Sequence, residues 1–367
     1  MRRWLRWGLL LLPAVGVGGL LVAASGVIPI EASSGHWAIT DWFLHFAMRR
    51  SVITHTLGSD PPALSEPWLV LKGAGHYEIG CRPCHGSPGL PQPRVARAMT
   101  PHAPDLTKAV TEWQPQQLFY IVKHGVKFTG MPAWPSQQRD DEVRAVVAFL
   151  LELPQLDRDK YRRLVHGDEV AARAAAPIAD LVPPSAVRVA AERCDLCHGG
   201  DGNGRGNAAF PKLAGQRRDY LYRALEAYAG DRRHSGMMQP IAAGLSTEER
   251  EQLADFYSRL PASAVAGGDA AAIERGRAIA RDGIASQGVP SCADCHGPGE
   301  HRRNPAYPNL AGQYADYLVL QLQLFQSRQR GGSAYAHLME RTASRLEAQQ
   351  IRDVAQYYAA QVQAPAR

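Results

Sequence analysis

Apolar residues recur at helical spacing in three segments of the chain: DDEVRAVVAFLLELP (140–154), STEEREQLADFYSRLP (246–261) and EAQQIRDVAQYYAAQV (347–362). In the second segment, Leu253, Phe256 and Leu260 fall on one face of a helix. Ser246 and Glu249 fit the capping box that starts such a helix. Strand-like alternation of apolar and polar residues is absent. The pattern therefore predicts an all-α fold.

A different apolar pattern opens the chain. After MRRWLRW, the uncharged stretch 7–30 would span roughly 36 Å as a helix, enough to cross a bilayer core. Arg2, Arg3 and Arg6 precede it and predict a cytoplasmic N-terminus. We predict a single-pass anchor over 1–30 in a bacterial cytoplasmic (inner) membrane, with the rest of the chain on the periplasmic side. The alternative is a signal peptide cleaved after LVAAS.

A juxtamembrane segment, residues 31–66, follows the predicted anchor. Within it, HWAITDWFLHFAMRR (36–50) is rich in aromatic residues and ends in two arginines, as interfacial segments do. The alternative is an element that packs on the first folded domain. The segment either lies at the membrane surface or belongs to that domain.

The second half of the chain contains an internal repeat. FPKLAGQRRDYL (210–221) matches YPNLAGQYADYL (307–318) at a constant offset of 97 residues. We therefore expect a divergent first domain and a related pair, with boundaries at 67–155, 186–262 and 263–367, each a plausible domain size. Residues 156–185, rich in Ala, Pro and charge, read as a linker with one helix.

All six cysteines belong to C-x-x-C-H pentapeptides: CRPCH with Cys81, Cys84 and His85, CDLCH with Cys194, Cys197 and His198, and CADCH with Cys292, Cys295 and His296. In this motif two cysteines attach haem c and the histidine ligates its iron. A redox dithiol needs no histidine at the next position, and a zinc site of two pairs would leave the third pair over. The sequence predicts three covalently bound haem c groups.

Methionines predict the sixth iron ligands. Met131, the pair Met237 and Met238, and Met339 each follow a haem motif and precede a terminal helix. Ala and Leu follow Met238 at the same four- and seven-residue distances as they follow Met339, which favours Met238 over Met237. The alternative is that these methionines fill gaps in apolar cores.

Prolines predict the partners of the ligating histidines. Such a histidine usually donates its second ring N–H to a carbonyl, and proline holds its carbonyl on a rigid backbone. Pro104, Pro211 and Pro308 follow the three histidines by 19, 13 and 12 residues. The alternative is that they only shape loops.

The net charge of the chain says little about its partners. The formal charge is +6 and the sequence pI is near 9.0, but the charges are scattered and form no basic run of the kind that nucleic-acid binders carry. The propionates of three haems would offset the excess. We expect redox proteins and a membrane as partners, and no nucleic acid.

These residues resemble class I cytochrome c, in which C-x-x-C-H, P-x-L-x-G and a methionine before a terminal helix follow in this order. Residues 186–363, with PKLAGQ and PNLAGQ, resemble the dihaem cytochrome c4 group. Residues 67–155, with KHGVKFTGMPAWP, resemble the cytochrome c domains of membrane oxidase and dehydrogenase subunits. The resemblance implies small helical domains, each around a largely buried haem.

The resemblance implies electron transfer rather than catalysis by this chain, and we expect delivery of electrons to a terminal oxidase. The first alternative is the cytochrome subunit of a periplasmic alcohol- or aldehyde-type dehydrogenase. A haem peroxidase is the second alternative. It needs an open iron position, whereas all three irons here have candidate methionine ligands.

Overall fold

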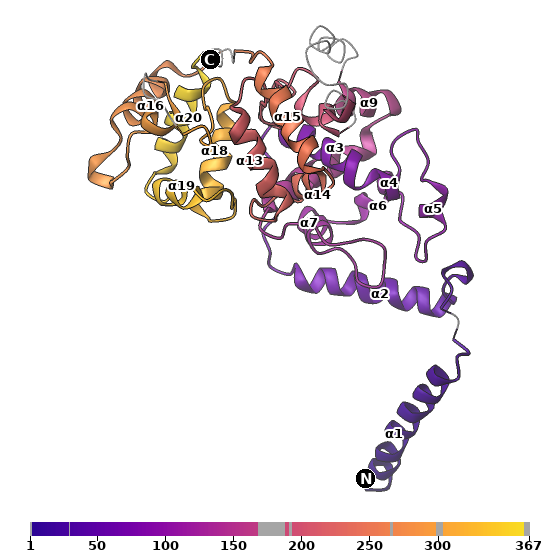
Figure 1. The fold of residues 1–367 in the computed structure, drawn as a ribbon. Coiled ribbons are helices and arrows are strands. Elements are labelled where there is room, and N and C mark those ends of the chain that lie inside the picture. The colour runs from indigo at the N-terminus through magenta and orange to yellow at the C-terminus, as the bar shows by residue number, and fades with distance from the viewer. Residues whose placement is uncertain are drawn as a thin grey trace.

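A computed structural model describes residues 2–28, 30–167, 188–190, 193–264, 267–298 and 304–362, with the backbone alone for 2–12. The described residues form helices joined by loops and contain no β-strand, as the sequence predicts. Figure 1 shows the helices α13, α14 and α15 between the helices of the first and last parts of the chain.

Two helices of the described chain precede the first predicted domain: α1 (Arg2–Ala24) and α2 (Ala38–His55), joined through the 3-10 turn η1 (Ala32–Ser34). Figure 1 shows α1 extending away from the other helices. Among the described residues, no helix combines the length and the apolar character needed to cross a membrane. The side chains of residues 2–12, in the first part of the predicted anchor, lie outside the described residues.

Helix α2 combines the two alternatives for residues 36–50, an interfacial segment and an element packed on the first domain. Its C-terminal half packs on the first unit: Val52 is buried, and the Arg49 guanidinium forms a 2.6 Å ion pair with Glu112. Its N-terminal half exposes aromatic side chains, with Trp42 and Phe43 60% and 57% exposed. The helix therefore rests on the first unit at one end and presents an apolar surface at the other.

The first unit is built around two crossing helices, α3 (Leu69–Gly80) and α8 (Asp140–Glu152). A Cβ atom on Gly73 of α3 would lie 1.9 Å from the Ala145 carbonyl oxygen, so only glycine permits this crossing. Gly75, on the same helix, faces the second unit. The remaining elements are α4 (Arg82–His85), α5 (Arg94–Arg97), α6 (Leu106–Ala109), η2 (Val110–Glu112), α7 (Pro115–His124), η3 (Leu153–Gln155) and α9 (Arg158–His166).

Helix α9 lies in the predicted linker but packs on α3 as part of the first unit. Its Tyr161 and Val165 are buried in the same apolar cluster as Tyr77 and Phe149. The first core therefore extends to residue 167. Residues 168–185, the rest of the predicted linker, lie outside the described residues.

The second and third units share one plan, in which a terminal helix packs on an earlier one. The predicted capping box of Ser246 and Glu249 starts α15, and Glu347 forms an equivalent box with Gln350 at α20. Glu347 thus replaces serine without loss of the cap. The elements are α12 (Asp195–His198), α13 (Arg218–Ala229), α14 (Met238–Ala243) and α15 (Thr247–Arg259), then α16 (Ala270–Asp282), η5 (Ala285–Gln287), α17 (Ala293–His296), α18 (Ala315–Gln326), α19 (Ala336–Ala343) and α20 (Ala348–Ala359).

One apolar cluster joins all three units. It contains Trp68 and Ala148 from the first unit, Phe210 from the second, and Tyr314 and Leu324 from the third. Buried apolar contact of this kind fixes neighbouring units against one another. The three units therefore form one continuous folded body.

Candidate functional site

Each C-x-x-C-H pentapeptide folds as one helical turn, in α4, α12 and α17. The backbone N–H of the histidine donates to the carbonyl of the first cysteine at 2.9 Å in all three: His85 to Cys81, His198 to Cys194 and His296 to Cys292. Residues three and four apart lie on the same face of such a turn. The two sulfurs and the imidazole therefore face one side, as attachment to one porphyrin requires.

Four of the six cysteine thiols are buried, whereas Cys295 is an exposed residue. None of the six forms a disulfide. Burial raises the pKa of the Cys81 and Cys197 thiols to about 12, and that of Cys194 and Cys292 to about 11. This is the environment that the apolar edge of a porphyrin would occupy.

Each motif histidine contacts the proline that the sequence pairs with it. The Nδ1 atom lies 2.9 Å from the Pro104 carbonyl oxygen in His85, 3.0 Å from that of Pro211 in His198, and 2.9 Å from that of Pro308 in His296. Burial lowers the pKa of His85 and His198, and the proline contact offsets part of that shift. A neutral ring that donates from Nδ1 leaves the Nε2 lone pair available to iron.

The second and third candidate sites open into one cavity of about 640 Å³. Both pentapeptides contribute their cysteines and histidines to its lining, and so do Met237, Met238 and Met339. The lining brings together thiols, imidazoles and thioethers, which is the donor set of a haem c with a methionine ligand. The residues present therefore fit two haem groups in this region.

Met238 and Met237 differ in what they contact. Both line the cavity, but Met237 also packs against the apolar core of the first unit. Met238 is the first residue of α14, and Met339 lies within α19. The contacts of Met237 leave Met238 as the better candidate ligand.

The first candidate site lies outside this cavity. Its Met131 is half-buried in a loop, where its backbone N–H donates to the Thr129 hydroxyl and its carbonyl accepts from Val126. The side chain of Met99 reaches the adjacent Gly130, where a Cβ would lie 2.0 Å from the Met99 methyl carbon. A second thioether thus lies beside the predicted ligand loop, and the spacing of the motifs gave no sign of it.

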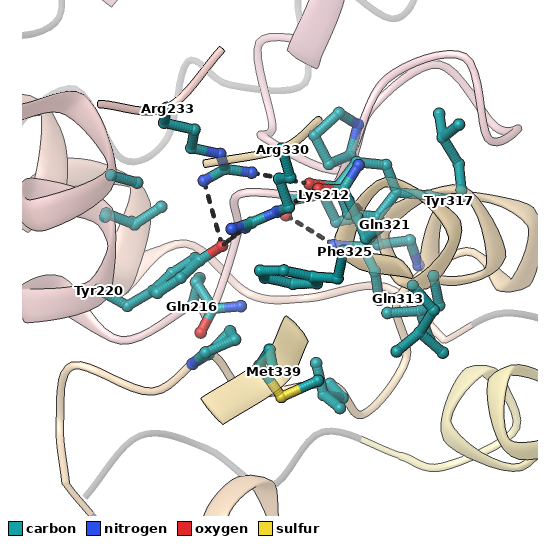
Figure 2. A pocket seen from close by; sticks show the side chains of 18 of the residues that line it. Lys212, Gln216, Tyr220, Arg233, Gln313, Tyr317, Gln321, Phe325, Arg330 and Met339 are labelled. Atoms are coloured by element: carbon teal, nitrogen blue, oxygen red, sulfur yellow. Dashed lines mark hydrogen bonds between the residues drawn. The ribbon is translucent and has the colours of Figure 1, made fainter. Parts of the chain in front are cut away.

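Two buried arginines meet at the cavity wall between the second and third units. Figure 2 shows both guanidinium groups converging on the hydroxyl of Tyr220, at 3.3 Å for Arg233 and 3.4 Å for Arg330. Each also lies over an aromatic ring, Tyr228 and Phe325 respectively. No carboxylate among the described residues forms an ion pair with either one. Burial, followed by the charge of Arg233, lowers the pKa of Arg330.

The interface between these two units is symmetric. The Gln313 side chain accepts from the Lys212 N–H and donates to the Lys212 carbonyl, both at 3.1 Å. In return, the Gln216 side chain accepts from the Asn309 N–H at 2.7 Å and donates to its carbonyl at 2.8 Å. Lys212 and Asn309 directly follow Pro211 and Pro308. The same loops therefore hold the histidines and join the units.

The first unit meets the second at the haem attachment turn of the latter. A Cβ on Gly75 of α3 would lie 2.8 Å from the Phe210 ring and 3.3 Å from the Cys197 sulfur. The Arg205 side chain reaches back to the Leu164 carbonyl at 3.1 Å. The second candidate site is thus in contact with both of its neighbours.

Sequence reasoning overlooked the two arginines and Glu142, a buried carboxylate of α8 that contacts the second unit. Arg233 and Arg330 stand at the same 97-residue offset as the repeat, as do Tyr220 and Tyr317. The repeat could therefore have marked the arginines as an equivalent pair. Nothing in the sequence indicated the partner of Glu142.

Comparison with known proteins finds c-type cytochromes. Residues 69–150 match the family described as cytochrome c oxidase, cbb3-type, subunit III. A thiosulfate dehydrogenase electron acceptor from Stutzerimonas stutzeri is 36% identical over 172 residues, which cover 46% of this chain and 79% of that protein. A cytochrome c4 from Thiocapsa roseopersicina is 34% identical over 166 residues, covering 45% and 84%.

Among solved structures, reduced recombinant cytochrome c4 from Pseudomonas stutzeri matches 48% of this chain and 97% of its own, with 29% identity and a TM-score of 0.45. The alignments with the two curated relatives cover 79% and 84% of those proteins. From the motifs, the histidine contacts and these relatives together, this chain belongs to the cytochrome c family, as an electron-transfer protein related to cytochrome c4.

Proposed function

We propose that this chain is a trihaem c-type cytochrome that carries electrons outside the cytoplasmic membrane, anchored by its N-terminal segment, and that delivers them to a terminal oxidase. The observation that carries the proposal is the histidine–proline contact, made at 2.9–3.0 Å in all three units. Bound haem c would supply a one-electron iron couple at each site.

The residues of the chain would prepare each site for that couple. Cys81 and Cys84, Cys194 and Cys197, and Cys292 and Cys295 would hold the three groups covalently. His85, His198 and His296 would present a neutral Nε2, and Met131, Met238 and Met339 would provide the thioethers. A thioether favours the ferrous state, so the sites suit the high-potential end of a respiratory chain.

Arg233 and Arg330 would supply positive charge for the propionates of the two haems held by the second and third units. Two buried cations close together are unfavourable without an anion, because burial removes the solvation of each charge. Haem propionates have the matching charge, and a guanidinium binds a carboxylate through two parallel N–H groups. This would secure both groups at the symmetric interface.

A second candidate function is favoured by the names of the relatives. Two proteins similar to this chain are described as thiosulfate dehydrogenase electron acceptors. We therefore also propose that the donor is a periplasmic dehydrogenase, which would make the chain the link between that enzyme and an oxidase. The two proposals are compatible, because one names the electron donor and the other names the electron acceptor.

Haem stoichiometry and redox titration test the proposal. The purified protein should carry three haems per chain by mass, retained after acid–acetone extraction, and should take up three electrons reversibly. Fewer than three covalent haems would overturn the trihaem proposal. The partner assignment is tested separately, by identifying what co-purifies from native membranes: a haem–copper oxidase, or a dehydrogenase with a flavin, quinone or haem.

A further inference from the structure

A buried carboxylate of the first unit holds the methionine loop of the second. Glu142, on α8, is 3% exposed. Its Oε1 accepts a hydrogen bond from the Ser235 hydroxyl at 2.6 Å, and its Oε2 accepts one from the Gly236 N–H at 2.6 Å. Ser235 and Gly236 immediately precede Met237 and Met238 in the chain.

The Ser235 hydroxyl also contacts the backbone of both methionines. Its oxygen accepts from the backbone N–H of Met238 at 3.0 Å and from that of Met237 at 3.3 Å. A hydroxyl has one proton to donate and two lone pairs to accept with, so all three contacts can be made at once. The first turn of α14 is thus connected to Glu142 through a single side chain.

The charge of Glu142 is balanced where it lies. The Arg139 guanidinium is 3.2 Å from its Oε1 and donates to the His234 carbonyl of the same loop at 2.6 Å. Arg139 is also paired with Asp141, which binds Lys72 at 3.0 Å. Hydrogen bonds to a buried, charge-balanced carboxylate are stronger than neutral ones and costly to break.

The loop also packs closely against the first unit. A Cβ on Gly236 would lie 2.2 Å from the Trp134 Nε1 atom, and that nitrogen donates to Glu142 at 3.0 Å. Met237 packs on the first core beside Trp134. Packing against Trp134 and hydrogen bonds to Glu142 therefore both hold the loop to the first unit.

We infer that Glu142 is a positioning residue for the sixth ligand of the second haem, acting across the unit boundary through Ser235 on the loop that carries Met238. This inference rests on the proposed ligation by Met238. It makes the ligation of the second haem depend on the docked first unit.

The other two methionines are held within their own units. The Met131 loop is tied back by the Trp134 N–H, which donates to the Lys123 carbonyl at 3.0 Å, and by the contact of Val126 with Met131. The segment after Met339 is held by the Gln326 side chain, which donates to the carbonyls of Ala343 and Leu346. Glu142 also accepts from the Trp134 indole N–H, beside Met131, so its variants change contacts of two loops. Loss of the Ser235 hydroxyl should affect one haem of three.

The experiment compares Glu142→Ala, Glu142→Gln and Ser235→Ala in the full-length haem protein, with Glu152→Ala at the exposed end of the same helix as control. The readouts are the long-wavelength absorbance band of methionine-ligated ferric haem, the three midpoint potentials and the unfolding midpoint. Ser235→Ala leaves the buried charges in place. It therefore tests the connection from Glu142 through Ser235 to Met238 even where Glu142→Ala does not fold.

We expect Ser235→Ala to lose up to about a third of the band and to lower one potential of three, the potential of the second haem. Glu142→Ala should lower the same potential and lose at least as much of the band. Glu142→Gln keeps the shape and one acceptor and should retain more of the band than Glu142→Ala. The double variant should lose no more than the stronger single one, because both residues act on the same loop. Glu152→Ala should match the wild type.

Met238→Ala separates this inference from the ligation on which it rests. If Met238→Ala keeps the full band, the ligand assignment is wrong and the inference falls with it. If Met238→Ala loses a third of the band while the Glu142 and Ser235 variants keep all of it, the ligand stands and the positioning role is overturned. A lower unfolding midpoint with an intact band and unchanged potentials would also overturn it, since that is the result of a purely structural contact.

Discussion

Arg233 and Arg330 donate to one shared acceptor, the hydroxyl of Tyr220, although they belong to different units of the repeat. Both are buried at the wall of the cavity that the second and third candidate sites share. Two like charges so placed stabilise any anion or added electron beside them. Their effect should therefore be visible in the redox behaviour of the two sites.

Arg330→Gln and Arg233→Gln should each lower the potential of at least one of the two c4-like haems by several tens of millivolts. Loss of a buried positive charge disfavours the reduced state, and a tenfold change in a one-electron equilibrium corresponds to about 59 mV. Spectroscopic redox titration measures the shift. Arg232→Gln, next in the chain but exposed, is the matched control. Unchanged potentials in both variants would show that the arginines serve packing alone.

Met339→Ala should open one haem of three to carbon monoxide, because the thioether is the proposed sixth ligand of the iron held by His296. Met339→His should keep that haem six-coordinate and lower its potential, since imidazole stabilises ferric iron better than a thioether does. Ferrous carbon monoxide difference spectra and redox titration distinguish the two variants. If neither changes the coordination of any haem, Met339 is a packing residue.

Gly276→Ala should destabilise the third unit by about 1–3 kcal/mol through overpacking. A Cβ at this position would lie 2.0 Å from the Asp353 carbonyl oxygen, where α16 crosses α20. Urea unfolding followed by circular dichroism gives the change in free energy. Glu274→Ala, exposed on the same helix, introduces the same side chain without the clash and should leave stability nearly unchanged. Equal stability of the two variants would contradict the close crossing.

Asp141→Asn should destabilise the first unit by about 3–5 kcal/mol at neutral pH, because it leaves Lys72 buried without its carboxylate partner and Arg139 paired with Glu142 alone. Burial alone raises the pKa of Asp141, but the attraction of Lys72 and Arg139 outweighs it and holds that pKa well below its usual range. The carboxylate therefore contributes stability above its unfolded pKa of about 3.9, and that contribution is lost as the pH falls below this value.

Unfolding measured between neutral pH and pH 3 tests this dependence. The wild type should lose stability on acidification more steeply than Asp141→Asn. Asp255→Asn, which removes a largely exposed pair with Arg259, is the control and should cost less than about 1 kcal/mol. Parallel pH profiles for wild type and Asp141→Asn would show that Asp141 titrates normally in the folded protein.

Much of the site is local in the chain and could be predicted from it. The pentapeptides place two cysteines and a histidine on one helical turn wherever they occur, because the spacing matches the pitch of the helix. The histidine–proline contacts span 12 to 19 residues of the chain, and the structure places all three pairs within hydrogen-bond distance. The helix caps of α15 and α20 follow from side chains three residues apart. In each case the partners are neighbours in sequence.

The sequence by itself determined the all-α fold, the spacing of the donor groups and the equivalence of the last two units, because helical periodicity, short loops and repetition are written in the order of residues. Only the tertiary structure decided how the units meet. Glu142 and Ser235 are 93 residues apart and Arg330 and Tyr220 are 110 apart, and no periodicity links them. Their pairing depends on how folded surfaces dock, since a buried charge becomes a partner only once the apolar surfaces around it have excluded water.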